Sequence, residues 1–133
     1  MSWDIFVMDL PKDAKSVDEI PQDFEGEPLG KRADLIAAIQ SVAPMADFPD
    51  PTWGTIKGPD WWIEVSLGEE DLCRHFAFHV RGGYEAAGVV AAILERLQLR
   101  AVGSGSGDFF VAGPEAEASF QRWREYRDQV VLG

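Results

Sequence analysis

The strongest constraint on the fold is a pair of alternating stretches near the middle of the chain. In residues 62–67 the apolar side chains of Ile63, Val65 and Leu67 alternate with more polar positions. The alternation resumes after a short acidic turn, with apolar side chains at Phe76, Phe78 and Val80. A period of two residues is the pattern of a β-strand with one buried face. We therefore predict a β-hairpin that places these six side chains in the core.

The alternation also restricts how the two strands pair. Odd-numbered core residues of the first strand must lie opposite even-numbered ones of the second, because a slip of one residue turns a whole set to the wrong face. One pairing that meets this condition sets Val65 opposite Phe76 and Ile63 opposite Phe78. The turn is predicted at residues 68–71, where Gly68 and charged side chains favour exposure to water.

The rest of the chain predicts further strands interspersed with helices. The proline-rich segment 44–51 is predicted to be an irregular connection. This order favours an α+β fold, in which a mainly antiparallel sheet carries helices on one face, of the ferredoxin-like sandwich type plus a C-terminal helix. We predict a single domain over residues 1–133, with a long acidic loop at 11–29 anchored by Ile20, Phe24 and Leu29. The predicted elements are strands at 3–10, 52–57, 100–102 and 108–112, and helices at 31–43, 84–98 and from Pro114 onward.

The charge balance is strongly acidic. The 133 residues include 23 Asp and Glu against 12 Lys and Arg, a net charge of −11. Residues 1–30 hold eight acidic and two basic side chains, and residues 60–71 hold five acidic and none basic. Such a field repels nucleic acids and anionic membranes and attracts basic partners. The plainer interpretation is that the acid serves solubility.

These features favour a non-catalytic interaction protein that binds a basic partner. Trp53 and Trp62 are predicted to point away from the helix-covered core, where tryptophan often anchors a bound protein. The alternative is that Phe120 and Trp123 of the C-terminal helix cover this face. The predicted binding residues are Trp53, Trp62, Asp18, Glu19, Asp23, Glu25, Glu27, Glu69, Glu70 and Asp71.

The outer face of the hairpin supports a different hypothesis, a small enzyme or ligand-binding protein. Glu64 and one of His75 and His79 have the residue types of an acid–base pair, with Trp62 as a wall. The two histidines lie two strand steps apart, each about 7 Å, which is a poor spacing for chelation of one metal ion. Without a nucleophile we expect no catalytic residue, no metal and no cofactor. The outer face is predicted to hold Trp62, Glu64, His75 and His79, with Cys73 and Arg81 at its ends.

Other signals concern self-association and location. The helix 84–98 carries small residues one turn apart, Gly88 and Ala92, which favour close approach of another element and allow a homodimer as a third hypothesis.

The glycine-rich segment 103–107 lacks the Lys-Ser/Thr of a phosphate-binding loop. The single Cys73 permits no internal disulfide, and the N-terminus lacks the pattern of a signal peptide. We therefore expect a cytoplasmic protein.

Three stretches resemble a group of small uncharacterised bacterial proteins. They are the start Met1-Ser2-Trp3-Asp4-Ile5, the strand from Trp61 to Gly68, and His79-Val80-Arg81-Gly82-Gly83. The resemblance extends over most of residues 1–112 and implies no catalytic residues, because the group has no assigned activity. It implies a bacterial cytosolic protein, and small acidic bacterial proteins of this build are often immunity or antitoxin proteins.

Overall fold

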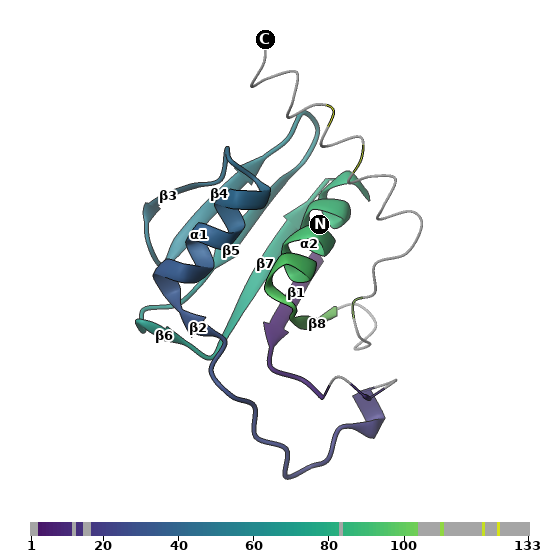
Figure 1. Ribbon diagram of the computed structural model, residues 1–133. Helices are drawn as coiled ribbons and strands as arrows, with labels where there is room; N and C mark the ends of the chain where they lie inside the picture. The colour runs from purple at the N-terminus through teal and green to yellow at the C-terminus, as the bar shows by residue number, and fades with distance from the viewer. Residues whose placement is uncertain are drawn as a thin grey trace.

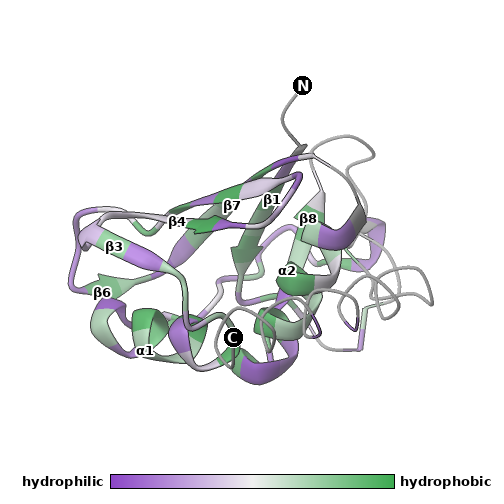
Figure 2. Ribbon diagram, turned by 90° about the horizontal axis from the view of Figure 1, so that it is seen from above, coloured by the Kyte–Doolittle hydropathy of each residue, from purple (hydrophilic) through white to green (hydrophobic). Residues whose placement is uncertain are grey.

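The fold of the described residues is α+β, with a six-stranded antiparallel sheet and two helices. The α+β class and the mainly antiparallel sheet are as predicted. A computed structural model describes residues 3–11, 13–14, 17–82, 84–103, 110, 121 and 125. The helices α1 and α2 contact each other and cover the same face of the sheet (Figures 1 and 2). The sheet order is β3-β4-β5-β7-β1-β8. The strands are β1 (Trp3–Met8), β3 (Asp47–Asp50), β4 (Trp53–Lys57), β5 (Trp62–Ser66), β7 (His75–Arg81) and β8 (Arg100–Gly103), and the helices are α1 (Arg32–Val42) and α2 (Tyr84–Leu97).

The core lies between the sheet and the two helices. The alternating stretches supply its centre, since Ile63, Val65 and Phe78 are fully buried and Phe76 and Val80 are only 3% exposed. The prediction of their buried face is therefore confirmed. The helix α2 is apolar on most sides because it packs against both β7 and α1. Its buried residues are Ala86, Ala87, Gly88, Val89, Val90, Ile93 and Leu94.

The predicted register of the hairpin is wrong by two residues. Ile63 lies opposite Val80 and Val65 opposite Phe78. The connection between β5 and β7 is longer than a four-residue turn, because residues Leu72–Cys73 form a separate short strand, β6. A shift of two residues leaves every side chain on its predicted face, so the sequence pattern could not detect it.

The predicted irregular connection at 44–51 contains a strand. Asp47–Asp50 form β3 at the edge of the sheet, paired with β4. Pro49 has no N–H to donate, which an edge strand tolerates, and the register shifts between Asp47 and Asp50. The turn that follows is fixed by Asp50, whose carboxylate accepts the N–H and the hydroxyl of Thr52 at 2.9 and 2.8 Å. These bonds, the backbone one foremost, lower the pKa of Asp50.

The described part of the segment between β1 and α1 holds a short 3-10 helix, Val17–Glu19, and the two-residue strand β2, Gly30–Lys31. It is held mainly by hydrogen bonds. The Asp9 carboxylate accepts the N–H of Glu27 at 2.8 Å, and Arg100 donates to the carbonyl of Ala14 at 2.8 Å. Of the predicted anchors, Leu29 packs against the core and Ile20 is half-buried. Phe24 is 37% exposed, so its prediction as an anchor is wrong.

The predicted strand at 108–112 and the predicted C-terminal helix lie largely outside the described residues. So do Phe120 and Trp123, the side chains that the alternative interpretation places over the outer face. Within this part of the chain, the N–H of Phe110 donates to the carbonyl of Ala101 in β8 at 2.7 Å.

Candidate functional site

A short antiparallel ladder brings together two acidic stretches that are far apart in the sequence. Strand β2 pairs with β6, and the ladder is extended by Leu29 N–H to the Cys73 carbonyl at 2.8 Å and Arg32 N–H to the Asp71 carbonyl at 2.7 Å. One acidic stretch runs into β2 and the other into β6, so they flank the two ends of the ladder. We call their exposed carboxylates the acidic border. It comprises Asp18, Glu19, Asp23, Glu25, Glu27, Glu69, Glu70 and Asp71.

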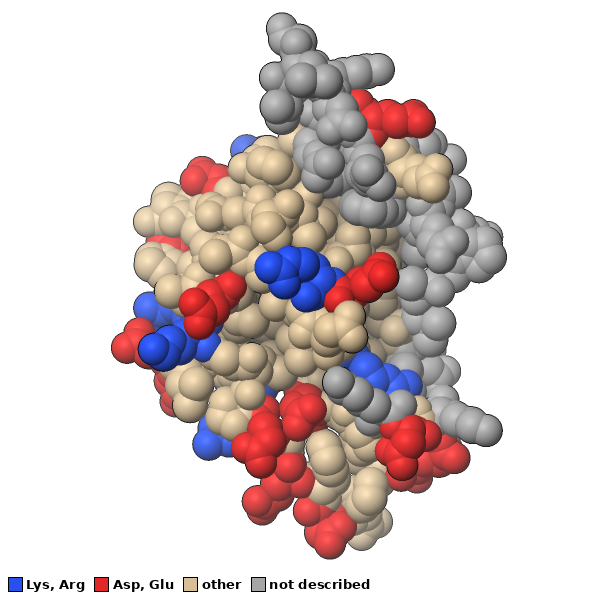
Figure 3. Space-filling model, in the orientation of Figure 1, with Lys and Arg blue, Asp and Glu red and all other residues tan. Residues whose placement is uncertain are grey.

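The charge of this region is visible on the surface. In Figure 3 carboxylates gather at the lower end of the molecule, where Figure 1 shows the segment between β1 and β2. The border is not purely acidic, because Lys31 and Arg74 are also exposed near the ladder. The acid nevertheless predominates, with eight carboxylates in the border. The ladder joins only the ends of the two acidic stretches, and the segment between β1 and β2 extends from it to the lower end of the molecule in Figure 1.

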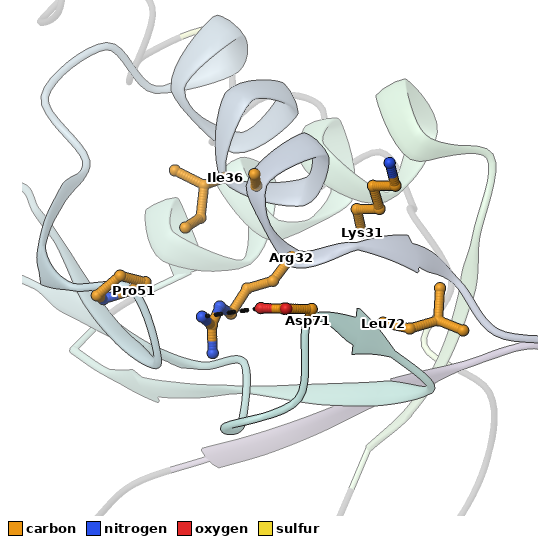
Figure 4. A pocket seen from close by; sticks show the side chains of 7 residues that line it. Lys31, Arg32, Ile36, Pro51, Asp71 and Leu72 are labelled. Carbon is orange, nitrogen blue, oxygen red and sulfur yellow. Dashed lines mark ion pairs between the residues drawn. The ribbon is translucent and has the colours of Figure 1, made fainter.

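A cavity of about 750 Å³ opens beside this border, between the first turns of α1, the turn at Pro51 and strand β6. Its apolar walls come from Ala33, Ile36, Pro51 and Leu72 (Figure 4). Leu72 is 47% exposed, which leaves its side chain available to a ligand. Pockets of this size with mostly apolar walls and a few polar groups are typical of binding sites.

The polar groups of the cavity are Lys31 and an ion pair between two distant segments, formed by Arg32 and Asp71. Arg32, at the start of α1, lies 3.6 Å from the Asp71 carboxylate, as the dashed line in Figure 4 marks, and also donates to the Gly68 carbonyl at 3.0 Å. Water screens this pair, because the Asp71 side chain is fully exposed although Arg32 is only 18% exposed. Asp71 can therefore form an ion pair with a cation from a partner at little cost to the fold.

No pattern in the sequence predicts this cavity. Its residues Ile36, Pro51 and Leu72 come from three segments whose contact depends on the ladder and on the turn before β4. One signal was present, since Leu72 is an apolar residue that directly follows Glu69, Glu70 and Asp71.

The second candidate surface is the face of the sheet opposite the helices. A row of neighbouring residues crosses four strands there in the order Thr55, Glu64, His79 and Asp4. His79 Nδ1 lies 2.8 Å from the Asp4 carboxylate. The indole of Trp53 stacks on the same imidazole, with centroids 5.6 Å apart and planes at 18°.

The residues of the acid–base hypothesis are only partly brought together. Glu64 and His79 are direct cross-strand neighbours, whereas His75 lies four residues before His79, at the start of β7 and opposite Met8. Asp4 was not among the predicted site residues, although the alternation of β1, with Ile5 and Val7 buried, would place it on this face. Among the described residues no three His, Cys, Asp or Glu side chains gather as a metal site would require.

Both predicted tryptophans point away from the core. Trp53 is 43% and Trp62 is 42% exposed, and the guanidinium of Arg81 lies 5.4 Å from the Trp62 ring centroid. These tryptophans lie on the outer face of the sheet, opposite α1 and α2, whereas the cavity is built partly from α1. The tryptophans and the acidic border therefore belong to different surfaces.

The prediction that Cys73 lies at the end of the outer face is wrong. Its side chain is buried, with 2% exposure. It belongs to β6 rather than β7, and its thiol donates to the His75 carbonyl at 3.1 Å. Burial raises the pKa of this thiol, because the thiolate would lose its hydration.

We expect Cys73 to be nearly unreactive toward a thiol reagent in the native protein near neutral pH. Both the raised pKa and the burial act in this direction, since the thiolate is the reactive form. The measurement is the rate of modification by Ellman's reagent, with the protein in urea as the reference. Equal rates in the native and unfolded protein would contradict the buried placement.

The chain matches no model of a known protein family, no curated protein and no solved structure. The resemblance to small bacterial proteins therefore stays a sequence-based expectation. Of the helices in the described ranges, none has the length and apolar character needed to cross a membrane.

Proposed function

We propose that this protein is a non-catalytic binding protein for a basic partner protein, of the immunity or inhibitor kind. The observation that carries the proposal is the apolar cavity of about 750 Å³ at the acidic border, with the exposed Asp71 carboxylate at its wall. Carboxylates accelerate the encounter with a cationic surface, and burial of an apolar side chain prolongs the complex.

The chemistry of the cavity specifies what the partner presents. An aliphatic side chain would pack against Ile36, Pro51 and Leu72. A neighbouring lysine or arginine of the partner would pair with Asp71 and the adjacent Glu70. The partner is therefore a basic segment that carries at least one aliphatic residue, rather than a uniformly charged polycation.

The same proposal includes a ferredoxin-like sandwich fold and a cytoplasmic location. The strand order β5-β7-β1-β8, with a helix after β1 and another after β7, supports a ferredoxin-like sandwich extended by β3 and β4. A cytoplasmic location rests on the sequence alone.

The alternative is a small enzyme or ligand-binding protein that uses Glu64, His75 and His79. The bond from Asp4 to His79 favours it, because a carboxylate fixes the orientation of an imidazole. Trp53 covers one face of that ring and His75 lies apart. We therefore prefer the binding function.

The test uses two labelled peptides of alternating lysine and glycine, one with a central leucine and one with a central alanine. We expect the leucine peptide to bind about tenfold more tightly, since burial of the larger side chain is worth about 1.5 kcal/mol or more. Leu72→Ser should abolish this difference, whereas Phe24→Ser, at another exposed apolar position, should preserve it. Equal affinity of the two peptides for the unmodified protein would refute the role of the cavity.

The role of the acid is tested separately. Neutralising Asp18, Glu19, Asp23, Glu25 and Glu27 to their amides should slow association of the leucine peptide severalfold and flatten its salt dependence, because exposed charges act within a Debye length. Stopped-flow fluorescence at several salt concentrations measures both effects.

The matched control removes exposed carboxylates outside the border. Asp47→Asn with Asp60→Asn should leave the association rate close to that of the unmodified protein. If association is insensitive to salt and to all five border substitutions, the acid serves solubility only.

A further inference from the structure

The outer face of the sheet, opposite α1 and α2, is rich in exposed aromatic side chains. Phe6, Trp53 and Trp62 are each between 41% and 43% exposed, and all three project from this face. Figure 2 shows both helices on the opposite side of the sheet. The three rings are spread over the face, since Ser66 and Ala77 separate Trp53 from Phe6 in one row and Trp62 lies two rows away. Large aromatic side chains exposed on one sheet face are costly to leave in water and are typical of an interaction surface.

The charges on this face form two rows of opposite sign. One row holds Lys57, Trp62 and Arg81, which are direct neighbours across β4, β5 and β7. The next row along the same face holds Glu64 and Asp4, on either side of His79. The four inner strands β4, β5, β7 and β1 thus present two cations and two carboxylates, in a chain whose net charge is −11.

We propose that this face binds the same face of a second copy of the chain, forming a two-fold symmetric dimer. In the pairing we assign, the strands of the two copies run antiparallel. The row of Lys57 and Arg81 in one copy then lies over the row of Asp4 and Glu64 in the other. A parallel arrangement would set cation over cation and carboxylate over carboxylate.

The charges on this face favour a second copy of the chain over a basic partner protein. A second copy is strongly acidic, so it can approach closely only where the surface is not acidic, and the inner strands provide such a surface. A basic partner would instead be drawn to the acidic border, which carries most of the excess carboxylates. Aligned sheets pack face to face about 10 Å apart with their side chains interdigitated, which would bury Trp53 and Trp62.

The dimer does not depend on the proposed binding function. The cavity includes residues of α1, on the helix side of the sheet. The acidic border and the outer face carry different residues, so each can be altered without the other. A dimer with no affinity for basic peptides, or a monomer that binds them, would separate the two proposals.

The experiment is sedimentation velocity of the full chain over a range of concentrations. We expect a reversible dimer, and Trp53→Ala with Trp62→Ala should raise its dissociation constant at least about tenfold. The control, Phe24→Ala with Leu72→Ala, removes two exposed apolar side chains elsewhere and should leave dimerisation unchanged. A monomer at all concentrations, or a dimer insensitive to the tryptophan substitutions, would overturn the proposal.

A charge exchange tests the antiparallel pairing. Lys57→Glu with Arg81→Glu should be monomeric, and so should Asp4→Lys with Glu64→Lys, because each variant repels itself. An equimolar mixture should form a heterodimer, since the opposite rows again face each other. Circular dichroism of each variant reports its folding. Two folded variants that stay monomeric when mixed would show that the rows do not pair.

Discussion

Phe78→Ala should lower the free energy of unfolding by about 3–5 kcal/mol. Phe78 is fully buried on the inner face of β7, with Ile5 and Val65 as its cross-strand neighbours. Its ring also meets Phe76 edge-on, with centroids 5.2 Å apart and planes at 71°. Truncation removes this buried surface and leaves a cavity that the sheet and the helices cannot close.

Urea denaturation followed by tryptophan fluorescence measures the loss. Domains of this size have total stabilities of about 5–15 kcal/mol, so the expected change is a large part of the whole. Phe24→Ala is the matched control, since Phe24 is 37% exposed, and its loss should stay below about 1 kcal/mol. A loss below 1 kcal/mol at Phe78 would show that the assignment of the buried face is wrong.

Gly82→Ala should destabilise the protein by about 2–5 kcal/mol, through backbone strain and overpacking together. Gly82 has a φ of +104°, a conformation that side chains with a Cβ rarely adopt. An added Cβ would also lie 2.6 Å from the Cα of Trp61 and 2.7 Å from the Asp60 carbonyl oxygen. These are backbone atoms beside the buried Trp61 and cannot move aside as a flexible side chain would.

Gly68→Ala separates the two causes. Gly68 has a similarly positive φ of +83°, but an added Cβ there would meet nothing within 4 Å. Gly68→Ala should therefore lower the free energy of unfolding through backbone strain alone, by about 1–2 kcal/mol. The same urea titrations compare the two variants. Equal losses at Gly82 and Gly68 would contradict the close approach to Trp61.

The sequence by itself determined which side of each central strand is buried. The alternation at Ile63, Val65, Phe78 and Val80 separates apolar from polar positions, and the free energy of burying the apolar set decides the face. The net charge of −11 is likewise set by the sequence, since it does not depend on the fold. The outward direction of Trp53 and Trp62 followed from the same alternation.

Only the tertiary structure decided the register, the edge strand β3 and the ladder between β2 and β6. Alternation decides on which face of the sheet a side chain lies, but not which residue it pairs with on the next strand. A shift of two residues in the pairing of Ile63 therefore leaves the pattern unchanged. A ladder of two residues is too short to show any period.

The cavity and the contact between Asp4 and His79 depend on these pairings. Ile36, Pro51 and Leu72 carry no common local signal, because they meet only after the sheet has set the distances between their segments. Asp4 and His79 lie 75 residues apart, and pairing of β1 with β7 brings their side chains within 2.8 Å. Side-chain direction is thus a local property of this sequence, whereas proximity between segments is a property of the folded chain.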